Sequence, residues 1–240
     1  NPKKNIIAII GLGYVGLPLL IEFSKKYKVI GFDLNKKRME EVKNGKDSYN
    51  ENIIKSELHY KNCSFADKIE SLHTADIFII TVPTPIFKNN KPNLFPLKRV
   101  SRDIASVINK GSILIFESTV YPGVTEDVCV PIIEKYSGMV FNKDFYCGYS
   151  PERINPGDKK HQLKNIIKIV SGSNRKTLDI VDQLYSSIIK AGTYRVSSIK
   201  TAEAAKIIEN TQRDINIALM NELSMIFNKL ELETEEILDA

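Results

Sequence analysis

Short apolar runs alternate with longer amphipathic segments through most of this 240-residue chain. Five of the runs are rich in β-branched or aromatic residues: Ile6–Ile10, Lys28–Asp33, Ile77–Val82, Ile113–Glu117 and Phe145–Tyr149. Near-continuous apolarity is typical of strands that are buried on both faces. Segments with helical spacing lie between them: Tyr14–Tyr27, Lys36–Asn44, Leu97–Asn109 and Thr125–Tyr136. This alternation predicts an α/β fold with a doubly wound, Rossmann-type parallel sheet.

The last third of the chain is expected to add edge strands and then a long helix. Two further strands are predicted at Ile166–Ser171 and Thr193–Val196, joined by a helix over Asn174–Lys190. From Lys200 to Leu230 there is no Gly or Pro, and apolar residues recur at helical spacing, which predicts a helix of roughly 45 Å. We therefore expect one domain over residues 1–197. Residues 198–240 then hold a long connecting helix that begins a second, all-α domain.

Composition and charge exclude several classes of protein. The 34 Lys and Arg residues exceed the 29 Asp and Glu residues by five, but no tract of five or six like charges occurs. This balance suits an anionic small molecule and gives no sign of nucleic-acid binding. No stretch approaches the roughly 18 apolar residues of a membrane span. The three cysteines (Cys63, Cys129 and Cys147) lack CxxC spacing, which predicts reduced thiols in a cytoplasmic protein with neither disulfide nor metal site.

The first predicted strand runs into the sequence GLGYVG at residues 11–16. A GxGxxG motif alone is weak, but this one follows a strand, opens a helix and precedes a second strand that ends in Asp33. Gly11 can make the tight turn, Gly13 lets the backbone approach a pyrophosphate, and Gly16 allows close helix packing. Asp33 would bind the ribose hydroxyls and repel the 2′-phosphate of NADP. The motif therefore favours NAD, with a purely structural turn as the alternative.

Three more positions are candidates for the cofactor site. Arg38 could stack on adenine through its planar guanidinium, although a solvated helix residue is an equal alternative. Thr84 and Thr119 belong to the segments TVPTP at 81–85 and ESTVYPG at 117–123, each at the end of a predicted strand. Prolines stop these strands, so we expect the threonine hydroxyls, that of Thr81 included, to point into the crevice. Helix capping is the alternative role.

Taken in order, these motifs resemble the UDP-glucose/GDP-mannose dehydrogenase family. The matching segments are GLGYVG at 11–16, VPTP at 82–85, ESTVYPG at 117–123, SPER at 150–153 and KIIENTQRDINIALMNE at 206–222. SPERINPGD at 150–158 is similar to the branch that acts on UDP-N-acetylhexosamines for capsule or O-antigen polysaccharides. UDP-glucose enzymes carry a second carboxylate where this chain has Pro156. The resemblance favours UDP-GlcNAc or UDP-GalNAc as substrate.

The resemblance implies a four-electron oxidation of the sugar C6 alcohol to a carboxylate with two NAD. Lys206 and Asn210, four apart on one helix face, would hold the developing oxyanion and the substrate. Glu152 would be the base that activates water, Thr119 would position that water, and Glu152 and Arg153 would contact the substrate. For Lys206 and Asn210 the alternative is a pair of ordinary helix residues. The cofactor residues implied are Gly11, Gly13, Tyr14, Val15, Gly16, Asp33, Arg38, Thr84 and Thr119.

The family's nucleophile is a cysteine in a glycine-rich loop, and none of the three cysteines here has such surroundings. We expect Cys63 in a polar connection, Cys129 on a helix face and Cys147 inside a strand, all as packing residues. The nucleophile and the uridine-binding domain are then expected beyond Ala240, and the chain alone is expected to be inactive. The resemblance also implies a homodimer across the helix at 200–230. A UDP-glucose or UDP-ManNAc dehydrogenase, a two-electron dehydrogenase of the β-hydroxyacid type, and an NAD-binding module without catalysis remain alternatives.

Overall fold

Eight strands form one sheet in the computed structural model, which describes residues 5–49, 62–152 and 165–240. The strands are β1 (Ile6–Ile10), β2 (Lys28–Phe32), β3 (Cys63–Phe65), β4 (Ile77–Ile80), β5 (Ile113–Phe116), β6 (Tyr146–Tyr149), β7 (Lys168–Gly172) and β8 (Thr193–Arg195). Their order across the sheet is β3-β2-β1-β4-β5-β6-β7-β8. All neighbours from β3 to β6 are parallel, whereas β7 runs antiparallel to β6 and parallel to β8. The predicted doubly wound sheet is confirmed.

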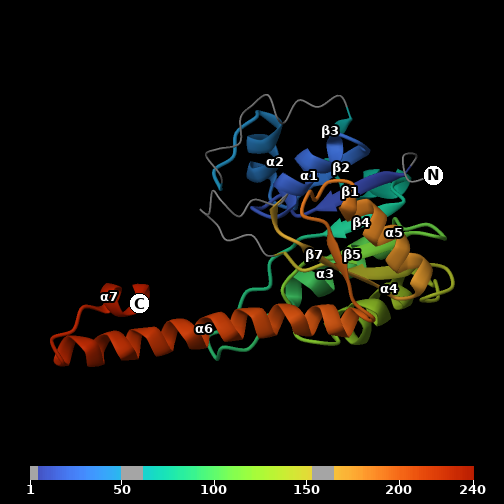
Figure 1. Cartoon of the computed structure of the whole chain (residues 1–240). Coiled ribbons are helices and arrows are strands. Elements are labelled where there is room, and N and C mark those ends of the chain that lie inside the picture. The colour runs from blue at the N-terminus through green and yellow to red at the C-terminus, as the bar shows by residue number, and fades with distance from the viewer. Residues whose placement is uncertain (1–4, 50–61, 153–164) are drawn as a thin grey trace.

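The connections between strands are mostly helical (Figure 1). They are α1 (Gly16–Ser24), α2 (Lys36–Lys43), a 3₁₀ turn η3 (Ile69–Thr74), α3 (Phe95–Ala105), a π-helical turn η4 (Val124–Cys129), α4 (Val130–Ser137), α5 (Arg175–Ser186), α6 (Ile199–Lys229) and α7 (Thr234–Asp239). Among the described helices, three begin with a side-chain cap, because Asn35, Asn174 and Ser198 each accept a hydrogen bond from a backbone N–H of the first turn. These caps fix where α2, α5 and α6 begin.

Each face of the sheet is covered by its own set of helices. Ile7 and Ile9 of β1 pack in the core formed with α1, α2 and α5. Ala8 and Ile10 point the other way, into the core formed with α3, α4 and the start of α6. Because side chains alternate along a strand, β1 is apolar on both faces, as its sequence predicts.

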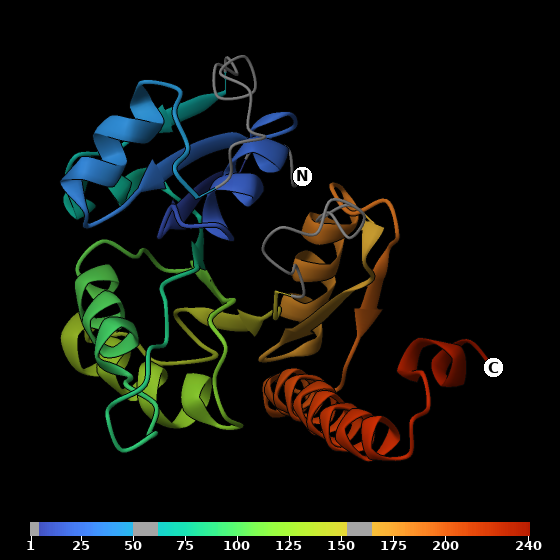
Figure 2. The same cartoon turned by 90° about the vertical axis from the view of Figure 1, so that its left-hand side faces the viewer.

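The long helix α6 has 31 residues, which agrees with the predicted length. Its buried residues, Ile199, Ala202, Glu203 and Lys206, all belong to the first two turns. The rest of α6 extends away from the sheet, with α7 at its far end (Figure 1), and Figure 2 shows α6 nearly end-on beside the strands. Despite its length, α6 is too polar for a bilayer crossing, and no other described helix has the length and apolarity for one.

Two local expectations were wrong. Cys63 opens the edge strand β3 beside β2 instead of lying in a polar connection. The predicted helix over Thr125–Tyr136 is interrupted, because a π-helical turn, in which the N–H of Val130 donates to the carbonyl of Thr125, precedes α4. Pro131 in the first turn of α4 has no N–H to donate, so a continuous α-helical ladder cannot run through this point.

Candidate functional site

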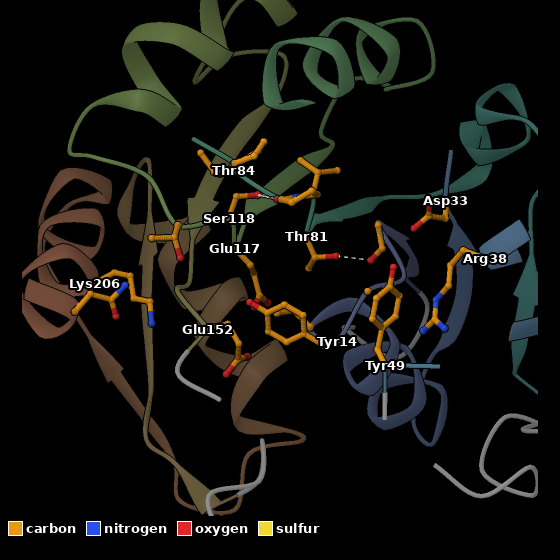
Figure 3. A pocket seen from close by; sticks show the side chains of 18 of the residues that line it. Tyr14, Asp33, Arg38, Tyr49, Thr81, Thr84, Glu117, Ser118, Glu152 and Lys206 are labelled. Carbon is orange, nitrogen blue, oxygen red and sulfur yellow. Dashed lines mark hydrogen bonds between the residues drawn. The ribbon is translucent and has the colours of Figure 1, made fainter. Parts of the chain in front are cut away.

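The order of the strands reverses between β1 and β4, and a cavity of about 840 Å³ lies at the carboxyl ends of these strands. Ligands of open α/β sheets bind at such a reversal. The cavity brings together eleven of the predicted site residues: Gly11, Gly13, Tyr14, Val15, Asp33, Arg38, Thr84, Thr119, Glu152, Lys206 and Asn210. Figure 3 shows Asp33, Arg38 and Tyr49 on one side of it and Lys206 and Glu152 on the other. Arg153, also predicted, lies outside the described residues.

The glycine turn after β1 has the geometry that its sequence predicts. Gly11 has φ +97°, a left-handed conformation that favours glycine. A Cβ on Gly16 would lie 1.8 Å from the Gly11 carbonyl oxygen, so no larger residue fits there. A Cβ on Gly13, in contrast, would meet no atom within 4 Å, because this side of the turn faces the open cavity. The turn and the N-terminus of α1 therefore fit a pyrophosphate group.

Asp33 follows β2 and is held rigidly. Its Oδ2 accepts a hydrogen bond of 2.7 Å from the backbone N–H of Leu12, and its Oδ1 accepts one of 2.8 Å from Asn35. Asp33 also lines a second cavity of about 290 Å³. The apolar walls of that cavity are Ile10, Phe32, Leu34, Ile69, Val82, Pro83, Phe95, Pro96 and Val100. A ribose at Asp33 and a flat adenine ring between these walls fit the arrangement.

Arg38 is almost fully buried and is bonded to other parts of the protein. Its Nε donates to the carbonyl oxygen of Leu12 at 2.7 Å, and it forms an ion pair with Asp47 at 2.7 Å. The guanidinium also lies 4.6 Å from the centre of the Tyr49 ring, which covers one of its faces. Arg38 thus ties α2 to the glycine turn, and stacking of adenine on the guanidinium stays a prediction.

The threonine hydroxyls at the strand ends differ in their environments. Thr81 lines the large cavity as expected, but its hydroxyl donates to the Gly11 carbonyl oxygen at 2.6 Å and so fixes the glycine turn. Ser118 similarly donates to Val82 at 2.6 Å. The buried Thr84 hydroxyl has no hydrogen-bond partner among the described residues and lines the cavity. Such an orphaned polar atom fits a bound polar ligand.

Lys206 and Asn210 lie one turn apart on α6 and both line the large cavity. Lys206 is only 8% exposed, and its Nζ lies 3.9 Å from the carboxylate of Glu209. The buried Lys206 ammonium lies on the side of the cavity away from Asp33, as Figure 3 shows, and the partly exposed Asn210 amide lines the same cavity. Both groups can donate hydrogen bonds to an oxyanion, which is the role that the resemblance implies.

Glu152 follows β6 and belongs to a buried cluster that the sequence analysis missed. Lys168 donates to Glu152 at 2.8 Å and to Glu117 at 2.7 Å, while the Tyr185 hydroxyl donates to the other oxygen of Glu117. Burial raises the pKa of Glu117 and that of Tyr185 above their usual values. Burial alone would lower the pKa of Lys168, but the two adjacent carboxylates outweigh it and raise that pKa. A lysine inside an apolar strand segment was the available signal, since buried charges need partners.

No cysteine among the described residues lines the large cavity. Burial raises the pKa of Cys63 and of Cys129 to about 11, and it raises that of Cys147 well above its usual value. These thiols are therefore protonated at neutral pH and are poor nucleophiles.

Comparison with known proteins gives a consistent result. The NAD binding domain of the UDP-glucose/GDP-mannose dehydrogenase family matches residues 5–189, and the central domain of that family matches residues 200–240. The UDP-N-acetyl-D-glucosamine 6-dehydrogenase of Salmonella typhi is 56% identical over 98% of this chain and 55% of its own length. Protein CapL of Staphylococcus aureus is 55% identical over the same shares. The chain therefore spans about half the length of these curated relatives.

A solved structure adds support at the level of the fold. The UDP-D-ManNAc dehydrogenase of Pyrococcus horikoshii superposes with a TM-score of 0.91 at 33% sequence identity. The match covers 98% of this chain and 56% of that protein. The sheet, the glycine turn and the long helix thus share their arrangement with a known nucleotide-sugar dehydrogenase.

Proposed function

The chain belongs to the UDP-glucose/GDP-mannose dehydrogenase family, and we therefore propose that the full-length protein oxidises a UDP-N-acetylhexosamine. The C6 alcohol of the sugar becomes a carboxylate, and two NAD are reduced for each sugar. The single observation that supports this proposal most is the continuity of the large cavity. It runs from the glycine turn and Asp33 at one end to Lys206, Asn210 and Glu152 at the other. A dinucleotide and a sugar can therefore meet in one space.

The residues of the chain have separate tasks in this proposal. Bound NAD would supply the acceptor for the hydride that leaves C6. Gly13 and the N-terminus of α1 hold the pyrophosphate, and Asp33 holds the adenosine ribose and disfavours the 2′-phosphate of NADP. Lys206 and Asn210 stabilise the negative charge that develops on the C6 oxygen. Glu152 takes a proton from the water that hydrolyses the thioester between the oxidised C6 and the family's nucleophilic cysteine, and Thr119 positions this water.

The substrate is UDP-GlcNAc or UDP-GalNAc, and the product supplies the synthesis of capsule or other surface polysaccharide. Support comes from the 56% identical relative named a UDP-N-acetyl-D-glucosamine 6-dehydrogenase, and from the capsule-related name of CapL. A relative named a UDP-N-acetyl-D-mannosamine dehydrogenase is only 34% identical to this chain, so UDP-ManNAc is the second candidate substrate. The proposed location is the cytoplasm, consistent with three free cysteines.

The test measures how many NADH form for each UDP sugar that is oxidised. The full-length protein is incubated with NAD and, separately, with UDP-GlcNAc, UDP-GalNAc, UDP-ManNAc and UDP-glucose, and NADH is followed by absorbance. Two NADH for each UDP-GlcNAc or UDP-GalNAc support the proposal. Turnover of UDP-glucose alone, or one NADH for each sugar, would contradict it, and the second result would favour a two-electron dehydrogenase.

We propose that residues 1–197 form the NAD-binding domain and residues 198–240 a helical segment. The start of α6 at Ile199 supports this division. We also propose that two copies pair along α6. Beyond its first two turns this helix exposes large apolar side chains, each about half or more exposed: Ile208, Ile215, Ile217, Leu219, Met225, Ile226 and Leu230. Exposed apolar surface of this extent is typical of an interface.

A further inference from the structure

The direction of β7 places a lysine at the catalytic edge of the sheet. Because β7 runs antiparallel to β6, its first residue, Lys168, lies at the edge where β5 and β6 end. Glu117 directly follows β5, and Glu152 comes shortly after β6. The Lys168 ammonium bridges the two carboxylates, at 2.7 Å from Glu117 Oε2 and 2.8 Å from Glu152 Oε2. One cation therefore joins groups from two different strand ends.

Tyr185 holds the inner side of this cluster in place. The hydroxyl of Tyr185, from α5, donates to Oε1 of Glu117, so both oxygens of that carboxylate are engaged. The Lys168 ammonium also lies 5.4 Å from the centre of the Tyr185 ring. The side chains of Glu117 and Lys168 are 0% and 3% exposed, whereas that of Glu152 is 9% exposed. Glu117 and Glu152 both line the large cavity, and of the two Glu152 is the more exposed while Glu117 is held at both of its oxygens.

A purely structural role explains this arrangement poorly. Three charges and a phenol are expensive to bury, and well-packed apolar side chains are commonly as stable or more stable in such positions. Two members of the cluster, Glu117 and Glu152, line the large cavity, as do the charged residues Lys206, Arg213 and Asp214 of α6. Its position at the wall of the site points to a role in the reaction.

We propose that Lys168 is a positioning residue for Glu152, which it holds as an oriented carboxylate at the cavity wall by bridging it to Glu117. This inference rests on the proposed function, in which Glu152 is the base for the hydrolytic water. Lys168 touches neither the water nor the sugar in this role. It acts by fixing the oxygen atoms of Glu152 and by favouring their charged form.

The first test replaces Lys168 by methionine in the full-length enzyme. We expect Lys168→Met to lower kcat by roughly 10- to 100-fold with KM for NAD unchanged. The acid limb of the kcat–pH profile should move to higher pH, because a carboxylate without its cation keeps its proton longer. Lys168→Arg should restore part of the activity. The matched control is Lys176→Met, at an exposed lysine of α5. A folded Lys168→Met enzyme with the wild-type kcat and acid limb overturns the proposal.

A second variant separates positioning from folding. Glu117→Gln combined with Lys168→Met removes one charge of each sign, so the net charge of the cluster stays as it is in the wild type. We expect this double variant to regain stability but to keep the displaced acid limb, because Glu152 still lacks its cation. A return of the wild-type acid limb in the double variant would instead show that Lys168 matters only for charge balance.

The titration of Glu152 can be measured directly, without an assay of enzyme activity. The Glu152 carboxyl carbon is followed by ¹³C NMR in the full-length protein labelled at glutamate, and it is assigned by its loss in Glu152→Gln. We expect its titration midpoint to be higher in Lys168→Met than in the wild type, and equal midpoints overturn the inference. If the wild type reduces no NAD with any UDP sugar, the proposed function fails, but this titration still decides the link between Lys168 and Glu152.

Discussion

Glu203 on α6 accepts hydrogen bonds from both the backbone N–H and the hydroxyl of Thr125, at 3.0 and 2.7 Å. Its other oxygen accepts a bond of 2.5 Å from the N–H of Gly123, whose φ is +98°. Glu203 is fully buried and lies one turn before Lys206. This single carboxylate therefore fixes the distance between α6 and the loop that carries Thr119.

We expect Glu203→Gln to lower the free energy of unfolding by about 1–3 kcal/mol, because an amide group cannot accept all three bonds and one buried donor loses its partner. Urea denaturation of the chain measures this change. The control is Glu222→Gln, at an exposed position of the same helix, which should change stability by less than about 0.5 kcal/mol. Equal stabilities of the two variants would contradict the assigned role of Glu203.

The glycine turn offers a pair of substitutions with opposite consequences. Gly13→Val should leave the melting temperature nearly unchanged, because its Cβ meets no protein atom, but should abolish NAD binding by filling the space for the pyrophosphate. Gly16→Ala should instead destabilise the fold, because its Cβ would overlap the Gly11 carbonyl oxygen. Thermal unfolding and titration calorimetry with NAD check both. NAD binding by Gly13→Val at wild-type affinity would refute the placement of the cofactor.

Asp33 should determine the choice between NAD and NADP. We expect Asp33→Ala to weaken NAD binding at least tenfold, since the loss of a charge-assisted hydrogen bond costs about 1.5–3 kcal/mol. NADP binding should weaken less or improve, because the repulsion of the 2′-phosphate is removed. Calorimetric affinities for both dinucleotides measure the change in preference, with Asp67→Ala, at an exposed aspartate that lines neither cavity, as the control. An unchanged ratio of the two affinities would exclude this role.

The raised pKa values of Tyr185 and Lys168 predict that the folded chain loses stability in alkaline solution. Their pKa values in the folded chain are raised above the usual 10.0 and 10.5, so the folded chain keeps protons that the unfolded chain releases. The stability that they contribute is complete below about pH 10 and is lost as the pH rises above it. Above about pH 10, we expect the free energy of unfolding of Tyr185→Phe to fall less steeply with pH than that of the wild type. The two slopes should differ by up to about 1.4 kcal/mol per pH unit. Urea denaturation at several pH values tests this slope, with Tyr194→Phe, at an exposed tyrosine, as the control.

The exposed apolar face of α6 predicts that the chain forms a dimer and that a charge on this face breaks the dimer into monomers. We expect the chain to sediment as a dimer at micromolar concentration and Leu219→Asp to sediment as a monomer, because the variant places a charge within the apolar surface. Asn221→Asp adds the same charge at an exposed polar position nearby and should leave the dimer intact. A wild-type chain that sediments as a monomer at this concentration would contradict pairing along α6.

The sequence predicted those parts of the fold in which local pattern and burial agree. β1, β4 and β5 are buried on both faces, so their apolar runs were unambiguous. β3 has only three residues, none fully buried, and leaves almost no pattern. The glycine motif and Asp33 could be placed because their spacing is local. The bridge from Lys168 to Glu117 spans 51 positions and depends on the reversed direction of β7, which no local pattern encodes.

The reversal of strand order between β1 and β4 separates the ligand site from the sheet that carries it. The connections that leave these two strands turn toward opposite ends of the sheet, so none of them closes over the gap. The recess therefore follows from the order of the strands and does not depend on which side chains line it. Residues at its rim, such as Asp33 and Thr84, can be exchanged one at a time while the sheet beneath them stays the same. Redesign of cofactor or sugar preference should begin at that rim.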